Sequence, residues 1–292
     1  ITVTVNAVND APVATAGLSG ATDEDQSVAV ILSGSDVDGD VLIFSLDSDA
    51  SSGSVVVNGS IATYTPNTNF NGDDSFDFTV SDGVESSTET VTLTVSAVND
   101  APVLATVSDV SFDEDGSGST SLSGSDVDGD ALTYNITGGS DITASLSGSD
   151  VSFSATADFN GSESFTVSVT DGTETDSQSI TVTVNAVNDA PVATAGLSGA
   201  TDEDQSTVVT LSGSDIDGDN LTFSVGSATN GTLELNGSLV TYTPDANYNG
   251  GDSFDFTVSD GSESSSASVS LSVSAVNDAP VLASVSDVSF DE

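Results

Sequence analysis

The sequence contains no cysteine, histidine, lysine, arginine, methionine or tryptophan. Without cysteine and histidine it can form neither a disulfide nor a structural zinc site, and it has no Ser–His or Cys–His pair for nucleophilic catalysis. Without lysine it cannot form Lys–Asn isopeptide cross-links. Without any basic side chain it has no patch to neutralise phosphates, so we expect no binding to nucleic acid. No apolar run approaches the ~20 residues of a membrane span, so we expect no direct membrane insertion.

Acidic residues dominate the charged groups that are present. The chain has 292 residues, and its 47 Asp and Glu residues give a formal net charge of −47. Its polar atoms are carboxylate, amide, hydroxyl and backbone oxygens, which are the ligands that Ca²⁺ and Mg²⁺ prefer. Hydrophobic residues make up 36% of the chain and charged residues only 16%, so the composition favours folded domains over disorder.

A repeat of about 90 residues organises the chain. The pentapeptide Asn-Asp-Ala-Pro-Val occurs four times at spacings of 90, 89 and 89 residues, starting at Asn9, Asn99, Asn188 and Asn277. A fixed period of this kind predicts a repeat architecture. Residues 1–27 are identical to residues 180–206, so the repeats alternate in an A-B-A-B pattern.

The repeat landmarks also predict domain boundaries. We expect the last strand of a preceding repeat at 1–8, three repeats at 9–98, 99–187 and 188–276, and the first strand of a following repeat at 277–292. The out-of-phase ends favour a window on a longer polypeptide. The alternative is a self-assembling fibre subunit whose end strands complete neighbouring copies.

Each repeat has a β pattern. In the first repeat, runs rich in Val, Thr and Phe predict strands at 26–32, 41–46, 55–57, 61–64, 75–80 and 88–98. Phe76, Phe78 and Val80 recur at every second position and should share one buried face. Asn58-Gly59 and Asn236-Gly237 each lie between two such runs and predict hairpins. Six or seven strands in ~90 residues predict an all-β fold of tandem Greek-key sandwiches.

Four oxygen-rich motifs recur in phase with the repeats. They are Asp-Glu-Asp at 23–25, 113–115 and 202–204; Asp-x-Asp-Gly-Asp at 36–40, 126–130 and 215–219; an Asp before Gly at Asp82, Asp171 and Asp260; and a linker Asn-Asp pair before each Ala-Pro. An EF-hand is excluded because Gly39 stands at the fourth loop position, where an EF-hand needs glycine at the sixth. Ordinary Asp/Asn/Gly turns are the alternative. Carboxylates this closely spaced repel one another unless a cation is present.

The order of these motifs along the repeat resembles cadherin repeats. It resembles more closely the bacterial cadherin-like and immunoglobulin-like tandem repeats of giant extracellular adhesins, over essentially the whole chain. The resemblance implies a linear array of tandem Greek-key (cadherin/Ig-like) β-sandwiches with Ca²⁺ at the junctions between successive repeats.

The resemblance also implies the ligands of each junction. For the first full junction these are Glu24, Asn99, Asp100, Asp126, Asp128 and Asp171. For the second they are Glu114, Asn188, Asp189, Asp215, Asp217 and Asp260. The incomplete outer junctions retain Asn9, Asp10, Asp36, Asp38 and Asp82 at the front, and Glu203, Asn277 and Asp278 at the back. Ala97 stands where cadherins have a further Asp, and we expect Asp40, Asp130 and Asp219 to compensate.

These features favour a non-enzymatic, calcium-rigidified stalk or fibre segment of a repetitive surface adhesin, extracellular or at the cell surface, with a role in cell adhesion and biofilm. Its expected partners are neighbouring repeats of the same or an identical chain, with glycans on exposed Ser and Thr as a further possibility. A carbohydrate-binding module is an alternative, although tryptophan is absent and aromatic residues make up only 5%. A carboxylate-pair glycosidase is disfavoured because the acidic motifs recur in every repeat.

Overall fold

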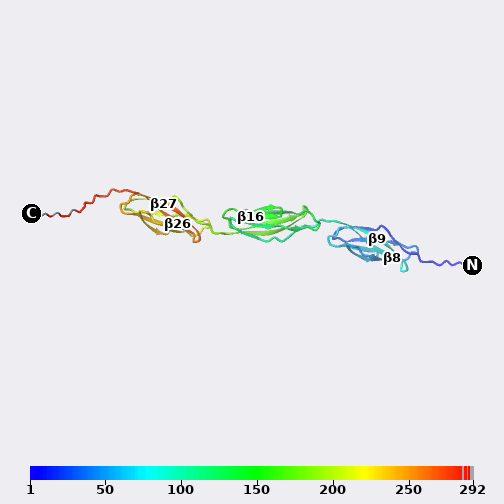
Figure 1. Ribbon diagram of the computed structural model, residues 1–292. Coiled ribbons are helices and arrows are strands. Elements are labelled where there is room, and N and C mark those ends of the chain that lie inside the picture. Colours follow the sequence, from blue (N-terminus) through cyan, green and yellow to red (C-terminus); the bar gives the residue numbers. More distant parts are fainter. Residues whose placement is uncertain (285, 288, 290–292) are drawn as a thin grey trace.

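Alternating Val, Thr and Phe residues form strands in the computed structural model, which describes residues 1–284, 286–287 and 289. Figure 1 shows three β-rich units that follow one another along the chain, joined by short extended segments. Each repeat therefore folds on itself, with its own buried core. No helix in the described part of the chain has the length and apolar character needed to cross a membrane.

Nine strands make up each unit, and their positions recur with the sequence period. In the first unit they are β1 (Val13–Ala14), β2 (Ser19–Asp23), β3 (Val28–Ile31), β4 (Gly34–Ser35), β5 (Ile43–Ser48), β6 (Gly53–Asn58), β7 (Ile61–Pro66), β8 (Gly72–Ser81) and β9 (Ser86–Ser96). In the second they are β10 (Val103–Leu104), β11 (Val110–Asp113), β12 (Ser117–Ser121), β13 (Gly124–Ser125), β14 (Thr133–Gly138), β15 (Ile142–Ser147), β16 (Asp150–Ala155), β17 (Gly161–Thr170) and β18 (Thr175–Asn185). In the third they are β19 (Val192–Ala193), β20 (Ser198–Asp202), β21 (Thr207–Thr210), β22 (Gly213–Ser214), β23 (Thr222–Val225), β24 (Gly231–Asn236), β25 (Leu239–Pro244), β26 (Gly250–Ser259) and β27 (Ser264–Ser274).

Two main sheets form a sandwich in each unit. In the first unit the four-stranded sheet has the order β2-β9-β8-β5 and the three-stranded sheet the order β3-β7-β6, while β1 and β4 form a separate pair. The second and third units have the same arrangement with their own strands. All pairs are antiparallel except the one between the second and last strands of each unit. That parallel pair places the end of β2, at Asp23, beside Ser96, where the chain leaves the repeat.

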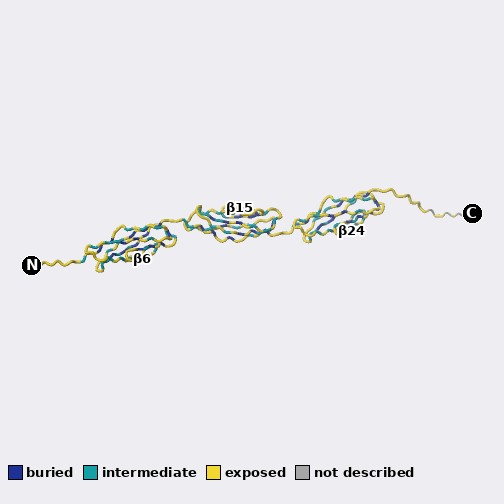
Figure 2. Tube along the Cα trace, turned by 180° about the vertical axis from the view of Figure 1, so that it is seen from behind, coloured by how far each residue is buried: buried dark blue, intermediate teal, exposed yellow. Residues whose placement is uncertain are grey.

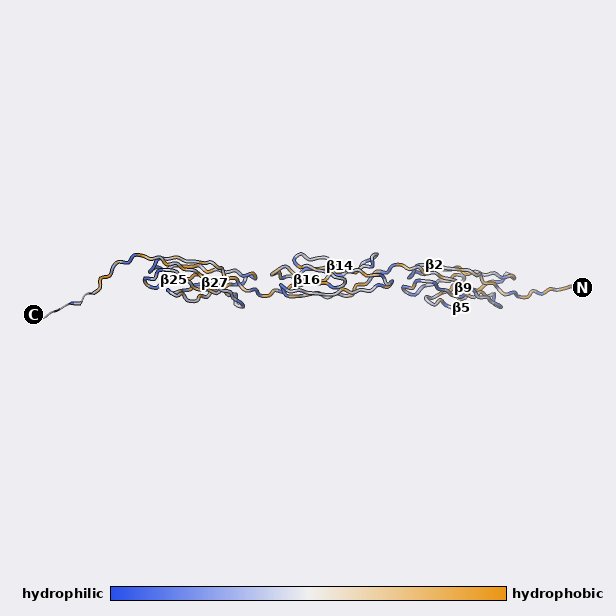
Figure 3. The backbone as a smooth tube through the Cα atoms, turned by 45° about the horizontal axis from the view of Figure 1, so that its top comes forward, coloured by the Kyte–Doolittle hydropathy of each residue, from blue (hydrophilic) through white to orange (hydrophobic). Residues whose placement is uncertain are grey.

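Each unit has its own core between its two sheets, and Figure 2 shows this buried interior separately in all three. Phe76, Phe78 and Val80 are at most 1% exposed, which confirms that they share one buried face. The equivalent residues of the other repeats are also buried: Phe165, Val167, Val169, Phe254, Phe256 and Val258. Figure 3 shows apolar and polar stretches interspersed along all three units. Burial of alternate residues thus stabilises every repeat separately.

The predicted strands are found, with different bounds, and three further strands are present. The strand predicted from residue 41 begins at Ile43, and the one predicted to reach residue 98 ends at Ser96. The sequence reasoning missed β1, β2 and β4 because they are short and poor in the β-branched and aromatic residues that mark strands. Gly20 of β2 lies so close to the core that an added Cβ would be 2.8 Å from a Val30 methyl. A strand with no large side chain still forms here, because its backbone pairs with β9.

Both predicted Asn-Gly hairpins are confirmed. Asn58 pairs with Ile61, so Gly59 and Ser60 form a two-residue loop, with a φ of 62° at Gly59. Asn236 pairs with Leu239, and Gly237 has a φ of 63°. A positive φ at the first loop residue is typical of the type II′ turn, which glycine adopts without strain.

The end segments lie outside these three sandwiches. Residues 1–8 are exposed and belong to no strand. The strand predicted within 277–292 falls partly on residues outside the described part of the chain, namely 285, 288 and 290–292, while residues 277–284 are in no strand.

Candidate metal centres at the repeat junctions

The first junction begins with Glu24, which directly follows β2. Because β2 runs parallel to β9, Glu24 lies at the exit of the first repeat, where its N–H donates to the Ser96 carbonyl at 3.0 Å. The Glu24 side chain is only 4% exposed, and its Oε1 accepts a hydrogen bond from the Val98 N–H at 2.6 Å. The glutamate of one repeat is therefore fastened to the linker that leads into the next.

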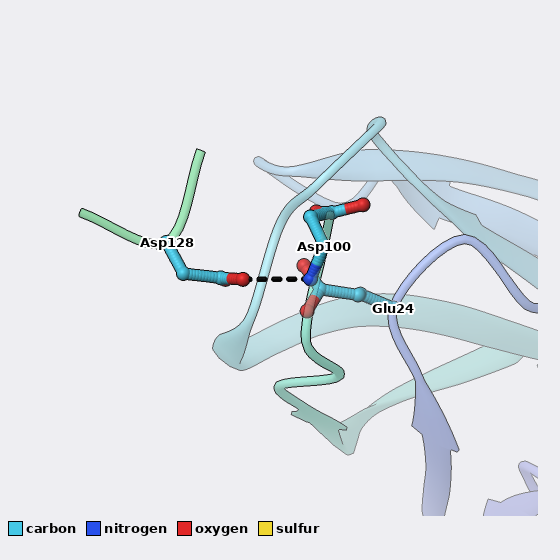
Figure 4. Close-up of side chains that lie close together, drawn as sticks. All are labelled: Glu24, Asp100 and Asp128. Atoms are coloured by element: carbon cyan, nitrogen blue, oxygen red, sulfur yellow. Dashed lines mark hydrogen bonds between the residues drawn. The ribbon is translucent and has the colours of Figure 1, made fainter. Parts of the chain in front are cut away.

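Two aspartates from the linker and the second repeat complete this cluster. The Asp100 N–H donates to Oδ2 of Asp128 at 2.8 Å, so the loop after β13 is fastened to the linker. Glu24, Asp100 and Asp128 each have a carboxylate oxygen within 4.8 Å of the others, and Figure 4 shows the three side chains converging. A second group lies on the same loop and consists of Asp126, Asp128 and Asp130. There the Asp130 N–H donates to Asp126 Oδ1 at 3.1 Å.

Several of these oxygens are buried without a hydrogen-bond donor in the described part of the chain. They are Glu24 Oε2, Asp100 Oδ2 and Asp126 Oδ2. Removal from water raises the pKa of Asp100, and the negative charges of Asp128 and Glu24 raise it further. Burying a carboxylate without a partner is costly, and the sequence contains no Lys, Arg or His to supply one. Hard oxygen ligands with uncompensated negative charge fit Ca²⁺.

The second junction has the same arrangement. Glu114 is 7% exposed and follows β11, its N–H donates to the Asn185 carbonyl at 2.9 Å, and its Oε1 accepts from the Val187 N–H. The Asp189 N–H donates to Asp217 Oδ2 at 2.8 Å, and Glu114, Asp189 and Asp217 place oxygens within 4.8 Å of one another.

Unpartnered oxygens recur at the second junction. Asp189 Oδ2 and Asp215 Oδ2 are buried without a donor among the described residues. Removal from water raises the pKa of Asp189, and the charges of Asp158 and Asp217 raise it further. The donor set again fits a divalent cation.

The Asp before Gly and the linker Asn have a different role in this structure. Asp171 Oδ1 accepts from the N–H groups of Thr173 and Glu174 at 2.6 and 2.7 Å, and its Oδ2 accepts from Asn99 Nδ2 at 2.9 Å. These hydrogen bonds lower the pKa of Asp171. The contact from linker Asn to Asp recurs from Asn9 to Asp82 and from Asn188 to Asp260. These pairs brace the linker on the following repeat, and metal binding by their carboxylates stays a prediction.

The same contacts occur in the parts of the two outer junctions that the chain contains. At the front, the Asp10 N–H donates to Asp38 Oδ2 at 2.8 Å, and Asp36, Asp38 and Asp40 group their oxygens within 4.8 Å. At the back, Glu203 is 6% exposed, its Oε1 accepts from the Val276 N–H at 2.6 Å, and its Oε2 accepts from Asn249 at 3.3 Å.

The remaining predicted residues lie beside these halves. Asn277 Nδ2 donates to the Asp278 carbonyl at 3.1 Å. On the third repeat, the Asp219 N–H donates to Asp215 Oδ1 at 3.2 Å. This is the same loop-closing contact that Asp130 makes with Asp126.

Sequence reasoning missed one carboxylate at the second junction. Asp158, in the loop between β16 and β17, places an oxygen within 4.8 Å of Asp115 and Asp189. The available signal was the difference between repeats, because the equivalent residues are Asn69 and Asn247.

Solved structures similar to this chain include arrays of cadherin or immunoglobulin-like domains and an enzyme. Mouse protocadherin-24 EC1-3 is 16% identical with a TM-score of 0.50, and the match covers 94% of this chain and 100% of that structure. Drosophila N-cadherin EC1-4 is 12% identical with a TM-score of 0.37, covering 89% of this chain and 75% of that one. The first similarity supports a shared fold.

The enzyme is an endo-fucoidan hydrolase from glycoside hydrolase family 107. It is 21% identical with a TM-score of 0.29, and the match covers 88% of this chain but only 43% of the hydrolase. This chain therefore spans less than half of the length of that enzyme, and so low a score carries no argument about activity.

No curated protein sequence matches this chain. A family model described as the bacterial Ig domain matches it three times, at residues 9–95, 99–184 and 188–272. These matches cover most of the chain and follow the three sandwiches one by one. The chain therefore belongs to the bacterial Ig domain family, with three domains in tandem.

Proposed function

We propose that this chain is a non-catalytic stalk segment of a bacterial surface adhesin, stiffened by Ca²⁺ at the junctions between its repeats. The observation that carries this proposal is a set of buried carboxylate oxygens that have no donor among the described residues and that converge from two successive repeats onto one linker. A chain without basic side chains cannot neutralise them itself. An external cation at these places would serve a mechanical role, because it would tie neighbouring repeats together.

The residues that would hold the ion come from both sides of each linker. At the first junction they are Glu24, Asp100, Asp126 and Asp128, and at the second Glu114, Asp189, Asp215 and Asp217. The bound ion supplies positive charge and links oxygens that otherwise repel. The chain itself contributes the positioning, because the backbone N–H groups of Val98 and Asp100 already hold Glu24 and Asp128 beside the linker.

A location outside the cell follows from the expected affinity. Extracellular calcium modules bind with dissociation constants of about 10⁻⁴–10⁻³ M. Millimolar Ca²⁺ is about 1–10 times such a dissociation constant, so each bound ion would stabilise the folded state by about 0.4–1.4 kcal/mol. For a domain of ~90 residues, whose total stability is of the order of 5–15 kcal/mol, each ion would contribute a measurable fraction. Millimolar Ca²⁺ outside cells would therefore stiffen the array, and cytosolic levels would leave it loose.

The repetition of the acidic motifs supports a building role rather than a catalytic one. Equivalent clusters occur at both full junctions, whereas a single active site would need only one set of residues. In this proposal each repeat runs from one Asn-Asp linker to the next, and its partners are the neighbouring repeats.

The proposal is tested by comparing the chain in Ca²⁺ and in chelator. We expect thermal unfolding followed by circular dichroism to shift upward by several degrees in millimolar Ca²⁺. Small-angle X-ray scattering should show a larger maximum dimension, as expected for a longer and stiffer particle. NaCl at matched ionic strength controls for screening of the −47 charge. Equal melting and scattering curves in Ca²⁺ and in NaCl would refute the calcium role.

A further inference from the structure

Two turns, each containing a residue with left-handed backbone conformation (positive φ), meet at the end of each repeat that faces the next linker. One contains the last residue of the Asp-Glu-Asp motif, with φ values of 57° at Asp25, 58° at Asp115 and 62° at Asp204. The other contains Asn69, Asp158 or Asn247, with φ values of 57°, 57° and 58°. Asn and Asp both tolerate this backbone region, so the fold accepts either residue there.

In the first and third repeats a hydrogen bond joins the two turns. The Asn69 N–H donates to Asp25 Oδ1, and the Asn247 N–H donates to Asp204 Oδ1, both at 3.1 Å. The second repeat has a carboxylate in place of the Asn side chain. Asp115, Asp158 and Asp189 place their oxygens within 4.8 Å of one another. The second junction therefore has one more negative charge than the first at this position.

Asp189 connects this group to the calcium cluster proposed above. It also belongs to the group of Glu114, Asp189 and Asp217, so it is a member of both groups. Its Oδ2 is buried without a donor in the described part of the chain, and Glu114 beside it is more than nine-tenths buried. These features point to a ligand independently of the number of acidic residues. Asp158 and Asp217 also line one hollow together with Asn160, Val187 and Ile216.

We propose that the second junction binds Ca²⁺ at a lower concentration than the first, because Asp158 adds a carboxylate to the site around Asp189. This inference rests on the calcium role proposed above. Ligand charge is one of the two properties by which proteins tune calcium affinity. One more unit charge about 5 Å from a divalent ion corresponds to an affinity difference on the order of tenfold, even with the dielectric constant of water.

A graded response follows from the alternation of the repeats. Asn69 and Asn247 stand in the two A-type repeats and Asp158 in the B-type repeat between them. At intermediate Ca²⁺ the second and third repeats would be locked together while the joint between the first and second still bends. The stalk would stiffen in pairs of repeats first and completely only at higher Ca²⁺.

The experiment measures each junction separately by spin labelling, which the absence of native cysteine makes simple. Thr65→Cys with Ser152→Cys reports on the first junction, and Ser152→Cys with Thr243→Cys on the second. All three positions are exposed and lie on equivalent strands. Pulsed electron paramagnetic resonance gives the width of the inter-label distance distribution at each Ca²⁺ concentration.

We expect the inter-label distance distribution across the second junction to narrow at about tenfold lower Ca²⁺ concentration than the distribution across the first. Asp158→Asn, which copies the residue at the equivalent position of the other repeats, should raise the midpoint of the second junction to that of the first. Asn69→Asp should lower the midpoint of the first junction. Circular dichroism in chelator verifies that each variant folds.

The outcomes separate this inference from the function on which it rests. If the distance distributions of both junctions narrow at one common Ca²⁺ concentration, and Asp158→Asn changes neither Ca²⁺ midpoint, the graded response is wrong and the calcium role stands. If neither junction responds to Ca²⁺, the calcium role itself fails.

Discussion

The Glu163 carboxylate, in β17, accepts several hydrogen bonds from the segment that leads into β15. Its two oxygens accept from the N–H groups of Ser140, Asp141 and Ile142 at 3.0–3.1 Å, and from the Ser140 hydroxyl at 2.5 Å. These bonds lower the pKa of Glu163 from 4.5 to about 2. The carboxylate thereby holds the segment before β15, in contrast to Asp100, whose Oδ2 is buried without a donor among the described residues.

The same position is occupied by a shorter acid in the other two repeats. Asp74 accepts from Ser51, Ser52 and Ser75, and also from the hydroxyl of the fully buried Tyr64 at 3.0 Å. Asp252 makes an equivalent contact with Tyr242 at 2.9 Å. Glu163, Asp74 and Asp252 thus have hydrogen-bond donors from their own repeat, whereas Asp100 Oδ2 has none among the described residues.

The lowered pKa of Glu163 predicts that the second repeat loses stability in acid. Because its pKa in the folded state lies below the ordinary value, its contribution is complete above pH ~4.5 and is lost as the pH falls toward 2. Glu163→Gln should therefore unfold at a lower temperature than the wild type at pH 6, and this difference should shrink between pH 4.5 and pH 2. Calorimetry measures it without interference from Ca²⁺ on protein that is stripped with chelator at neutral pH and then transferred to Ca²⁺-free buffers.

Glu174→Gln provides the control in the same repeat, because Glu174 is exposed and only its backbone forms hydrogen bonds with the described residues. It should melt with the wild type at every pH. A difference between wild type and Glu163→Gln that stays constant down to pH 2 would contradict the assigned role of Glu163.

At the scale of strands, a small residue leaves room for a large buried side chain on the neighbouring strand. Gly231 begins β24 and pairs with Pro244 at the end of β25. A β-carbon at Gly231 would lie 2.5 Å from the Thr243 carbonyl oxygen and 2.5 Å from the Tyr242 ring. The buried tyrosine therefore occupies the space that any larger residue at 231 would need.

Gly231→Ala should destabilise the third repeat by about 1–3 kcal/mol, the usual cost of overpacking a well-packed core. Gly251→Ala, in β26 of the same repeat, is the matched control, because its nearest contact would be 3.9 Å away. Its effect should stay below about 1 kcal/mol. Chemical denaturation measures both, and equal losses of stability in the two variants would show that packing against Tyr242 is not the cause.

At the scale of the whole molecule, the junctions should act independently. Contacts in a repeat array connect mainly neighbours, and each linker has its own set of carboxylates. Asp126 lies at the first junction, where its Oδ1 closes the loop at Asp130 and its Oδ2 has no donor in the described part of the chain. Asp215 has the equivalent position at the second junction, and its Oδ2 is likewise buried without a donor among the described residues.

Asp126→Ala should broaden the distance distribution across the first junction in saturating Ca²⁺ and leave the second within experimental error. Asp215→Ala should have the mirror-image effect. The spin-label pairs described above measure both junctions in each variant. A variant that broadens both junctions equally would indicate a coupled rod rather than a series of separate joints.

The sequence by itself determined the class of the molecule, the number of repeats and the buried faces. Strand composition, the fixed period and the alternation of Phe76, Phe78 and Val80 are local properties, and local properties can be read from neighbouring residues. The acidic motifs were equally visible, as was the absence of any basic residue to neutralise them.

Only the tertiary structure decided which oxygens of those motifs are free. Asp171 has its oxygens occupied by Thr173, Glu174 and Asn99, whereas Asp100 keeps a buried oxygen without a donor among the described residues. It also brought Asp158 to the second junction. The physical reason is that most of the groups that meet at a junction lie tens of residues apart in the chain, as Asn99 and Asp171 do. They are brought together by the parallel pairing of each repeat's second and last strands and by the fold of the next repeat, which no local pattern records.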